Sequence, residues 1–296
     1  MELSPPGNSI PLLQSLLNEC LKRSCHLKPF RIVNPVKDRL QSDPVKFKSI
    51  INFRDVAQAP GFPMDGLKKG LVFRSANPDK AKGSDIGRLK QLGIRTIVDL
   101  RGPSEVKTGR LSAQGISVVS YPLDFEQATR NKLYPLLRKK NPEKEILEVS
   151  NTLYLDILDA SGPVIKEIVN LLLDDDKSPI LIHCQAGKDR TGIIVALLLL
   201  ASGKSRDYIR NDFMLSNNDI LPYYRKQLII RKILRFGFLP FKTVLFAIAV
   251  KEQNIISVLD RVENHYGGID NFLKLSGVGE AEIGKLKSRL SKDYSI

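Results

Sequence analysis

The chain has 296 residues, of which 42% are hydrophobic and 26% charged, enough to bury a core of ordinary size. The formal net charge of +14 favours polyanionic partners such as nucleic acid, anionic lipid or phosphorylated ligands, without choosing among them. Residues 1–8 contain no Lys or Arg, and no long apolar run follows them. The most apolar stretch, residues 192–201, is too short to cross a bilayer. These features argue against a secretory signal and a membrane span, and predict a cytoplasmic protein.

Residues 1–45 are predicted to form an N-terminal extension, ahead of a domain that covers residues 46–296. The extension contains Cys20, Cys25 and His26, a loose cluster with no second ligand pair at zinc-finger spacing. The chain has only three cysteines, too few for a disulfide framework. The sequence therefore predicts no metal site and no cofactor.

From residue 51 onward, short apolar strands alternate with helical patterns. Strands are predicted at residues 71–74, 96–100, 116–121 and 179–183. Helices are predicted at residues 84–92, 143–158, 163–173 and 191–200. This alternation predicts an α/β fold, with a central, mainly parallel sheet flanked by helices.

After Ser205 the chain is predicted to be helical to its end. The predicted segments are residues 223–236, 255–265, 269–275 and 280–290. The first of them places five basic residues among apolar ones. A basic amphipathic helix can lie on an anionic membrane surface, and packing on the core with a solvated basic face is the alternative.

Residues 180–192 carry the chemistry: an apolar strand leads into a glycine-containing loop and then into an apolar helix. Five residues separate Cys184 from Arg190, a spacing that means little alone, because Cys25 and Arg31 share it. A loop between a strand and a helix can turn several backbone N–H groups toward one point, where the helix dipole also favours an oxyanion. Such sites lower the pKa of a cysteine from ~8.5 to roughly 3.5–7.5, which would make Cys184 a thiolate nucleophile.

Arg190 is expected to return to the centre of this loop, where its planar fork can hold two phosphate oxygens. Gly187 and Gly192 permit a tight turn and a close approach of the ligand. The pattern therefore predicts a site in which a cysteine attacks a bound phosphate group.

The run His-Cys-x-x-Gly-Lys-Asp-Arg-Thr-Gly at residues 183–192 resembles the signature of cysteine-dependent protein tyrosine phosphatases. It is most similar to the branch that contains bacterial and fungal tyrosine and lipid phosphatases. The likeness spans roughly residues 48–290 and includes the blocks Asn52-Phe-Arg-Asp55 and Phe73-Arg-Ser-Ala-Asn77. The resemblance implies metal-independent hydrolysis of phosphate monoesters through a phosphocysteine intermediate, chiefly on phosphotyrosine proteins.

The resemblance also gives roles to the residues of the loop. Cys184 would be the nucleophile and Arg190 the phosphate clamp. His183 would orient the loop and help to hold the thiolate, although it could equally be a core histidine. Thr191 would assist breakdown of the phosphoenzyme, or simply cap the helix. The remaining predicted substrate-binding residues are Gln185, Ala186, Gly187, Lys188 and Asp189.

The leaving oxygen needs a proton, and two aspartates compete to supply it. Asp189 lies inside the loop, and the similar branch uses this loop aspartate. Asp124 follows a predicted strand end, where other phosphatases carry a mobile acid loop. We expect Asp189 to be the acid, with Asp124 as the alternative. Asp99 and Arg101 end a central strand, where a buried pair that ties strand to loop is the simpler interpretation.

Lys188 adds positive charge without bidentate geometry, which suits substrates with more than one phosphate, although a solvated lysine is the alternative. Tensin-like lipid phosphatases have a lysine at the matching place, so the resemblance also allows a phosphoinositide or inositol phosphate substrate. Related enzymes carry helical lids, and we expect such an insertion at about residues 216–250. Peripheral contact with an anionic membrane is a further expectation.

The sequence argues against two non-enzymatic functions. A module that only binds phosphorylated ligands would normally have lost Cys184 or Arg190, and both are present. Nucleic-acid binding fits the positive charge, but the sequence has no aromatic stacking platform and no zinc finger.

Overall fold

The computed structural model describes residues 47–58, 66–106, 115–235 and 240–292. The predicted N-terminal extension, with Cys20, Cys25 and His26, lies outside the described residues.

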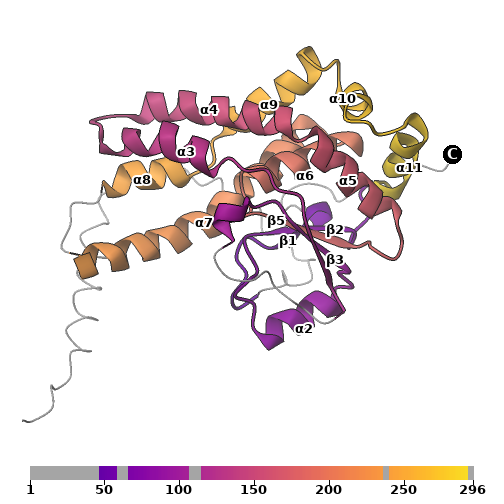
Figure 1. Ribbon diagram of the computed structural model, residues 1–296, viewed down its shortest axis with the longest axis horizontal. Coiled ribbons are helices and arrows are strands. Elements are labelled where there is room, and N and C mark those ends of the chain that lie inside the picture. The colour runs from indigo at the N-terminus through magenta and orange to yellow at the C-terminus, as the bar shows by residue number, and fades with distance from the viewer. Residues whose placement is uncertain (1–46, 59–65, 107–114, 236–239, 293–296) are drawn as a thin grey trace, which may run out of the picture. The chain divides into compact units, whose positions relative to one another are not determined.

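A five-stranded sheet forms the centre of the described domain (Figure 1). Its strands are β1 (Arg54–Asp55), β2 (Val72–Ser75), β3 (Thr96–Asp99), β4 (Ser117–Ser120) and β5 (Ile180–His183). Their order is β1-β2-β5-β3-β4, with β1 antiparallel to β2 and the other pairs parallel. The register places Ser75 and Asp99 beside His183, so the carboxyl ends of three strands meet where an α/β sheet usually binds its ligand.

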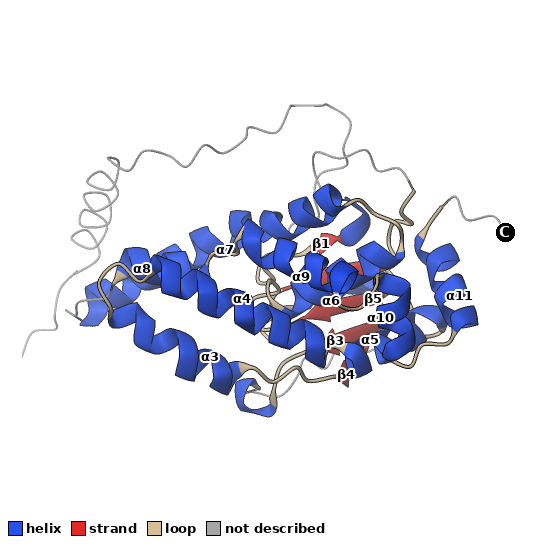
Figure 2. Cartoon of the chain, turned by 90° about the horizontal axis from the view of Figure 1, so that it is seen from above, coloured by secondary structure: helices blue, strands red, loops and turns tan. Residues whose placement is uncertain are grey.

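Helices lie on both faces of this sheet (Figure 1), and most of them lie on the face seen in Figure 2, which confirms the predicted α/β fold. The α-helices are α2 (Gly83–Gln91), α3 (Glu126–Leu133), α4 (Glu143–Ala160), α5 (Gly162–Leu173), α6 (Arg190–Ala201), α7 (Arg206–Arg235), α8 (Phe241–Ile248), α9 (Glu252–Asn264), α10 (Ile269–Leu275) and α11 (Glu280–Leu290). Short 3-10 turns are η1 (Val56–Gln58), η2 (Pro103–Glu105) and η3 (Tyr134–Arg138).

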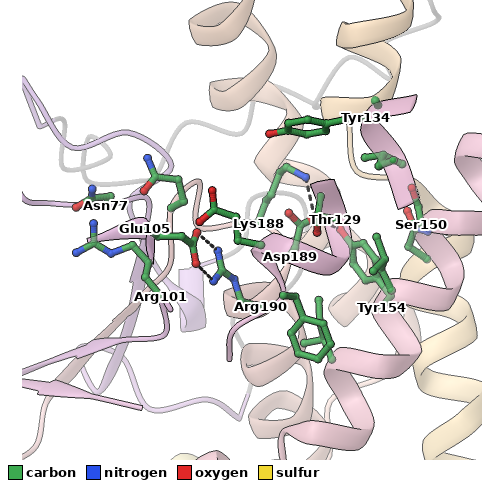
Figure 3. Close-up of a pocket in the computed structure, with 18 of the residues that line it drawn as sticks. Asn77, Arg101, Glu105, Thr129, Tyr134, Ser150, Tyr154, Lys188, Asp189 and Arg190 are labelled. Atoms are coloured by element: carbon green, nitrogen blue, oxygen red, sulfur yellow. Dashed lines mark hydrogen bonds and ion pairs between the residues drawn. The ribbon is translucent and has the colours of Figure 1, made fainter. Parts of the chain in front are cut away.

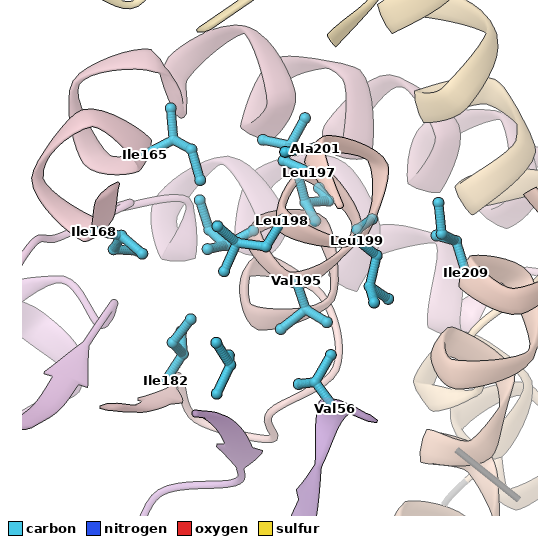
Figure 4. Close-up of a cluster of buried hydrophobic side chains, with 14 of the residues drawn as sticks. Val56, Ile165, Ile168, Ile182, Val195, Leu197, Leu198, Leu199, Ala201 and Ile209 are labelled. Atoms are coloured by element: carbon cyan, nitrogen blue, oxygen red, sulfur yellow. The ribbon is translucent and has the colours of Figure 1, made fainter. Parts of the chain in front are cut away.

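Alternate strand residues face two separate hydrophobic clusters, as a pleated strand requires. On one face Ile97 and Leu181 pack with Leu89 of α2. On the other, Val98 and Ile182 join a larger cluster with α5 and α6 (Figure 4). Because the central strands are buried on both faces, consecutive residues are apolar, at Ile97 and Val98 of β3 and at residues 180–182 of β5.

The structure departs from the predicted helix boundaries mainly in α7. The basic segment predicted from residue 223 is the second half of one 30-residue helix that continues through Pro222. A proline inside a helix costs roughly 3 kcal/mol. Burial of Phe213, Ile220 and Leu228 along the same helix offsets that cost. The short helix α3 was not predicted, because it buries no residue and so lacks an apolar period.

Within the described part of the chain, none of the helices combines the length and the apolar character that crossing a bilayer requires.

Candidate active site

Two buried side chains hold the loop that joins β5 to α6, residues 184–189. Asn52 donates through Nδ2 to the carbonyl oxygens of Ala186, at 3.2 Å, and Gly187, at 2.9 Å. Arg74 donates through Nη2 to the same Gly187 oxygen at 2.8 Å. Both side chains are buried, so water does not compete for these bonds.

These contacts set the direction of the loop amides. The backbone N–H of Asn77 also donates to the carbonyl of Gln185, at 3.2 Å, so three consecutive carbonyls bond to groups outside the loop. In a planar trans peptide the N–H points opposite to the C=O. The amides of Ala186, Gly187 and Lys188 therefore point toward the inside of the loop. Ahead of the first turn of α6, they make a concave row of donors suited to an oxyanion.

A buried ion network in turn fixes the two side chains that hold the loop. Asp212 of α7 lies 2.7 Å from Nε of Arg54 and 2.5 Å from Nη1 of Arg74. Burial would raise the pKa of Asp212, but the charges of the two arginines hold it below its usual value. Arg54 also donates to Oδ1 of Asn52 at 2.6 Å, which leaves the amide nitrogen of Asn52 facing the loop. In the sequence, Asn52, Arg54 and Arg74 stand in blocks that resemble the family, without assigned roles, and Asp212 was not singled out.

Arg190, the first residue of α6, is held by Glu105. Nη2 donates to Oε1 at 2.6 Å, Nη1 donates to Oε2, and Nη1 also reaches the Leu123 carbonyl at 3.1 Å (Figure 3). Although burial opposes it, the bond to Glu105 raises the pKa of Arg190 above its usual value. Among the described residues, Nε and one Nη2 proton of Arg190 have no acceptor, so they can hold two oxygens of a phosphate.

Cys184 is buried, with 2% of its surface exposed, and two guanidinium groups act on it. Burial lowers the pKa of Arg74 to about 10, and the negative charge of Cys184 works against that shift. The same charge helps to raise the pKa of Arg190 against the effect of burial. Both guanidinium groups therefore lie close enough to Cys184 to interact with it electrostatically. In the described residues the buried hydroxyl of Thr191 has no hydrogen-bond partner.

His183 is a buried, neutral histidine. Burial lowers its pKa to about 4, and its Nδ1 lies 3.3 Å from the Cys184 carbonyl oxygen. Its Nε2 lies 3.8 Å from Asp99. Asp99 itself pairs with Arg101 at 2.9 Å, and both are buried, as the interpretation of a strand-to-loop tie predicted.

A cavity of about 680 Å³ opens beside the loop (Figure 3). Its volume is in the range of small-molecule sites. From the loop it is lined by Gln185, Lys188, Asp189 and Arg190. The opposite wall comes from α3, η3, α4 and the end of α8, and includes Thr129, Tyr134, Tyr154, Ala247 and Ala249. No group of three or more His, Cys, Asp or Glu residues that could hold a metal ion occurs in the part of the chain that the structure describes.

Lys188 and Asp189 form an ion pair in the wall of this cavity, with 2.7 Å between Nζ and Oδ1. The Lys188 side chain is 14% exposed, so it is not a solvated surface lysine. Tyr154 of α4 donates its hydroxyl to the same oxygen. Burial would raise the pKa of Asp189, but Lys188 and these hydrogen bonds lower it, so the carboxyl group is ionised in the free protein. Sequence reasoning missed Tyr154, because its place in an apolar helical pattern is that of a core residue.

Asp124 is exposed and is not among the described residues that line the cavity. Its carboxyl group packs against Gly102, where an added Cβ would fall 2.3 Å from Cγ of Asp124. Its neighbour Leu123 accepts a hydrogen bond from Arg190. Both candidate acids therefore lie near Arg190. Asp189 precedes it in the sequence, and Asp124 follows Leu123, whose carbonyl accepts a hydrogen bond from Arg190.

Residues 45–292 match the model of the tyrosine phosphatase family. The chain belongs to this family. The triple specificity protein phosphatase PtpB of Mycobacterium tuberculosis is 28% identical over 272 residues, which cover 81% of this chain and 96% of that protein. The tyrosine-protein phosphatase of Nostoc commune is 25% identical over 244 residues, covering 80% and 79%.

A shorter match joins this phosphatase to the inositol diphosphatase DSP2 of Arabidopsis thaliana, which is 31% identical over 142 residues. That match covers 43% of this chain and 52% of the plant protein. The crystal structure of P. aeruginosa TpbA in complex with pTyr covers 71% of this chain and 88% of the solved chain, at 14% identity and a TM-score of 0.34, too low to add to the assignment.

We predict that Gly187→Ala inactivates this phosphatase. Gly187 has a φ of +65°, and a Cβ there would lie 2.1 Å from the Ser75 carbonyl oxygen, so the loop backbone must shift. A displacement of about 1 Å in a catalytic group can cost about 100-fold in rate, and we expect kcat/KM to fall at least that far.

Gly203→Ala is the matched control. Gly203, beyond the end of α6, has a φ of +74°, but a Cβ there meets no atom within 4 Å. It should cost about 1–2 kcal/mol of stability and leave kcat/KM near the wild-type value. Equal losses of activity in the two variants, each measured well below its Tm, would contradict this account of the loop.

Proposed function

We propose that this tyrosine phosphatase family member hydrolyses phosphate monoesters through a phosphocysteine on Cys184, with phosphotyrosine proteins as its main substrates. The observation that supports this most directly is the loop geometry, in which the amides of residues 186–188 face inward beside two donors of Arg190 that have no acceptor among the described residues. A row of amides and a guanidinium group together match the oxygens of a bound phosphate.

The reaction has two steps. The sulfur of Cys184 attacks phosphorus, so that a P–S bond forms as the P–O bond to the leaving group breaks. The loop amides and Arg190 stabilise the three equatorial oxygens, while an aspartate gives its proton to the leaving oxygen. Water then attacks the phosphocysteine and gives its proton to the same aspartate. The P–S bond breaks, and phosphate and the thiolate are released.

We assign the proton transfers to Asp189, with Asp124 as the alternative. Asp189 lines the cavity, whereas Asp124 is exposed outside its lining. Asp189 is ionised in the free protein because Lys188 and Tyr154 bind its carboxylate. A phosphate dianion in the loop adds negative charge nearby and competes for Lys188, and both effects raise the pKa of Asp189 toward protonation.

A phosphoinositide or inositol phosphate is the second candidate substrate. Lys188 and Lys80 both line the cavity in addition to Arg190, so the site has cations for a further phosphate group. The names of two relatives, a triple specificity phosphatase and an inositol diphosphatase, are consistent with this alternative.

We further propose that the region around residues 216–250 acts as a lid over the cavity. Ala247 and Ala249, at the end of α8, line the cavity, and α8 packs against both α4 and α7. Arg225 and Lys226 are exposed on the second half of α7, where they could contact an anionic membrane surface. A cytoplasmic location stays a prediction of the sequence.

We predict that Cys184→Ser lowers turnover by about 10⁴-fold or more while it preserves binding of a phosphotyrosine peptide, measured by calorimetry. On the wild-type protein, kcat/KM should be highest for phosphotyrosine peptides in a panel with phosphoserine peptides, phosphoinositides and soluble inositol phosphates. Turnover retained in the serine variant would refute the nucleophile, and a clear preference for an inositol substrate would replace phosphotyrosine by the second candidate.

The acid is tested by comparing Asp189→Asn with Asp124→Asn. We predict that Asp189→Asn lowers kcat by about 10²–10⁴-fold and removes the basic limb of the kcat–pH profile, because the residue that must be protonated is gone. Asp124→Asn should keep that limb. If only the Asp124 variant loses it, the assignment is reversed.

A further inference from the structure

One tyrosine that the mechanism above does not use lies against the loop carboxylate. Tyr154 on α4 is 6% exposed and lines the cavity. Its hydroxyl donates to Oδ1 of Asp189, which also accepts from Nζ of Lys188 at 2.7 Å (Figure 3). The Asp189 carboxylate therefore has two donors that come from two different elements.

The two donors differ in their freedom to move. The ring of Tyr154 stands edge-on to Phe213 of α7, with 5.8 Å between the ring centroids. Phe213 is itself fully packed, because an added Cβ on Gly192 would fall 2.9 Å from its ring. Lys188 has a flexible stem and can turn its ammonium group to a ligand. The phenol of Tyr154 cannot leave its place without repacking these rings.

We propose that Tyr154 is a positioning residue for the reaction: its hydroxyl, with the Lys188 ammonium group, holds the Asp189 carboxyl group against the catalytic loop. This inference rests on the proposed role of Asp189. When the Lys188 ammonium group turns to a bound phosphate, the Tyr154 hydroxyl still donates to the Asp189 carboxyl group. The carboxyl group therefore stays beside the leaving oxygen.

Several ionisable groups face Asp189 or its two donors. They are Arg74, Tyr154, Cys184, Lys188, Arg190, Tyr224 and Lys251. Burial raises the pKa of Asp189, and Lys188, the Tyr154 hydroxyl and Arg190 together outweigh that effect. Removal of the Tyr154 hydroxyl should therefore move the titration of Asp189 to higher pH, since one stabilising donor to the ionised form is lost.

Tyr154→Phe tests the inference, because it removes the hydroxyl and keeps the ring. Two quantities are measured on the full chain: the titration of the Asp189 carboxyl carbon by NMR of ¹³C-aspartate-labelled protein, assigned with Asp189→Asn, and the kcat–pH profile. We expect the titration midpoint and the basic limb of kcat each to rise by about one pH unit, the size expected for one hydrogen bond to a charged group.

Tyr208→Phe is the matched control. Tyr208 is equally buried, with 5% exposed, and its hydroxyl donates to the Val56 carbonyl at 2.9 Å. Loss of this bond should leave both the Asp189 titration and the kcat–pH profile unchanged.

The outcomes separate this inference from the proposed function. An unchanged Asp189 midpoint in Tyr154→Phe overturns the inference, whichever residue is the acid. The inference is also overturned if Tyr154→Phe shifts the Asp189 titration midpoint but leaves the basic limb of the kcat–pH profile in place, while Asp189→Asn removes that limb. If the basic limb survives in Asp189→Asn, Asp189 is not the acid and that part of the proposed function fails. If Tyr154→Phe still shifts the Asp189 titration midpoint, Tyr154 nevertheless positions the Asp189 carboxylate.

Discussion

The active site depends on the hydrogen bonds that turn the loop carbonyls outward. Asn52 and Arg74 bind the carbonyl oxygens of residues 186 and 187, so that the amides which follow must face the ligand. A loop with the same sequence but free carbonyls would present mixed donors and acceptors to a phosphate. The proposed anion site thus depends on contacts made on the opposite side of the loop.

Arg54, Arg74 and Arg190 lie around the loop and have different partners. Arg54 and Arg74 are bound to Asp212, and through it they tie the loop to helix α7. Breaking one partner of such a buried network leaves an uncompensated charge, typically at a cost of about 3–5 kcal/mol. Arg190 is instead held by Glu105 along one edge, which leaves donors for a ligand on the other. Because α7 also supplies Phe213 beside Gly192, this helix contacts the first turn of α6 as well as supporting the loop.

The sequence predicted the fold class, four of the five strands and the loop, because their signals are local: apolar runs, glycine punctuation and a contiguous motif at residues 183–192. The two-residue strand β1 was not predicted, because it is too short to form an apolar run. It could not predict the partners that hold the loop. Asn52 lies 134 residues from the carbonyl it binds at Ala186, and Glu105 lies 85 residues from Arg190. Tyr154 is 35 residues from Asp189 and looks like a core residue in its helix. Such contacts follow from the sheet order, and the family resemblance marked only some of their positions.

A crystal structure of the wild-type chain with bound vanadate would test most directly whether the loop amides face a phosphate group. Vanadate mimics the five-coordinate transition state of phosphoryl transfer. We expect vanadium to be bonded to Sγ of Cys184. Its oxygens should accept hydrogen bonds from the amides of residues 186–188 and from Nε and Nη2 of Arg190, while Glu105 stays hydrogen-bonded to Nη1 and Nη2 of Arg190. Loop carbonyls turned toward the ion, or vanadate bound away from the sulfur, would contradict it.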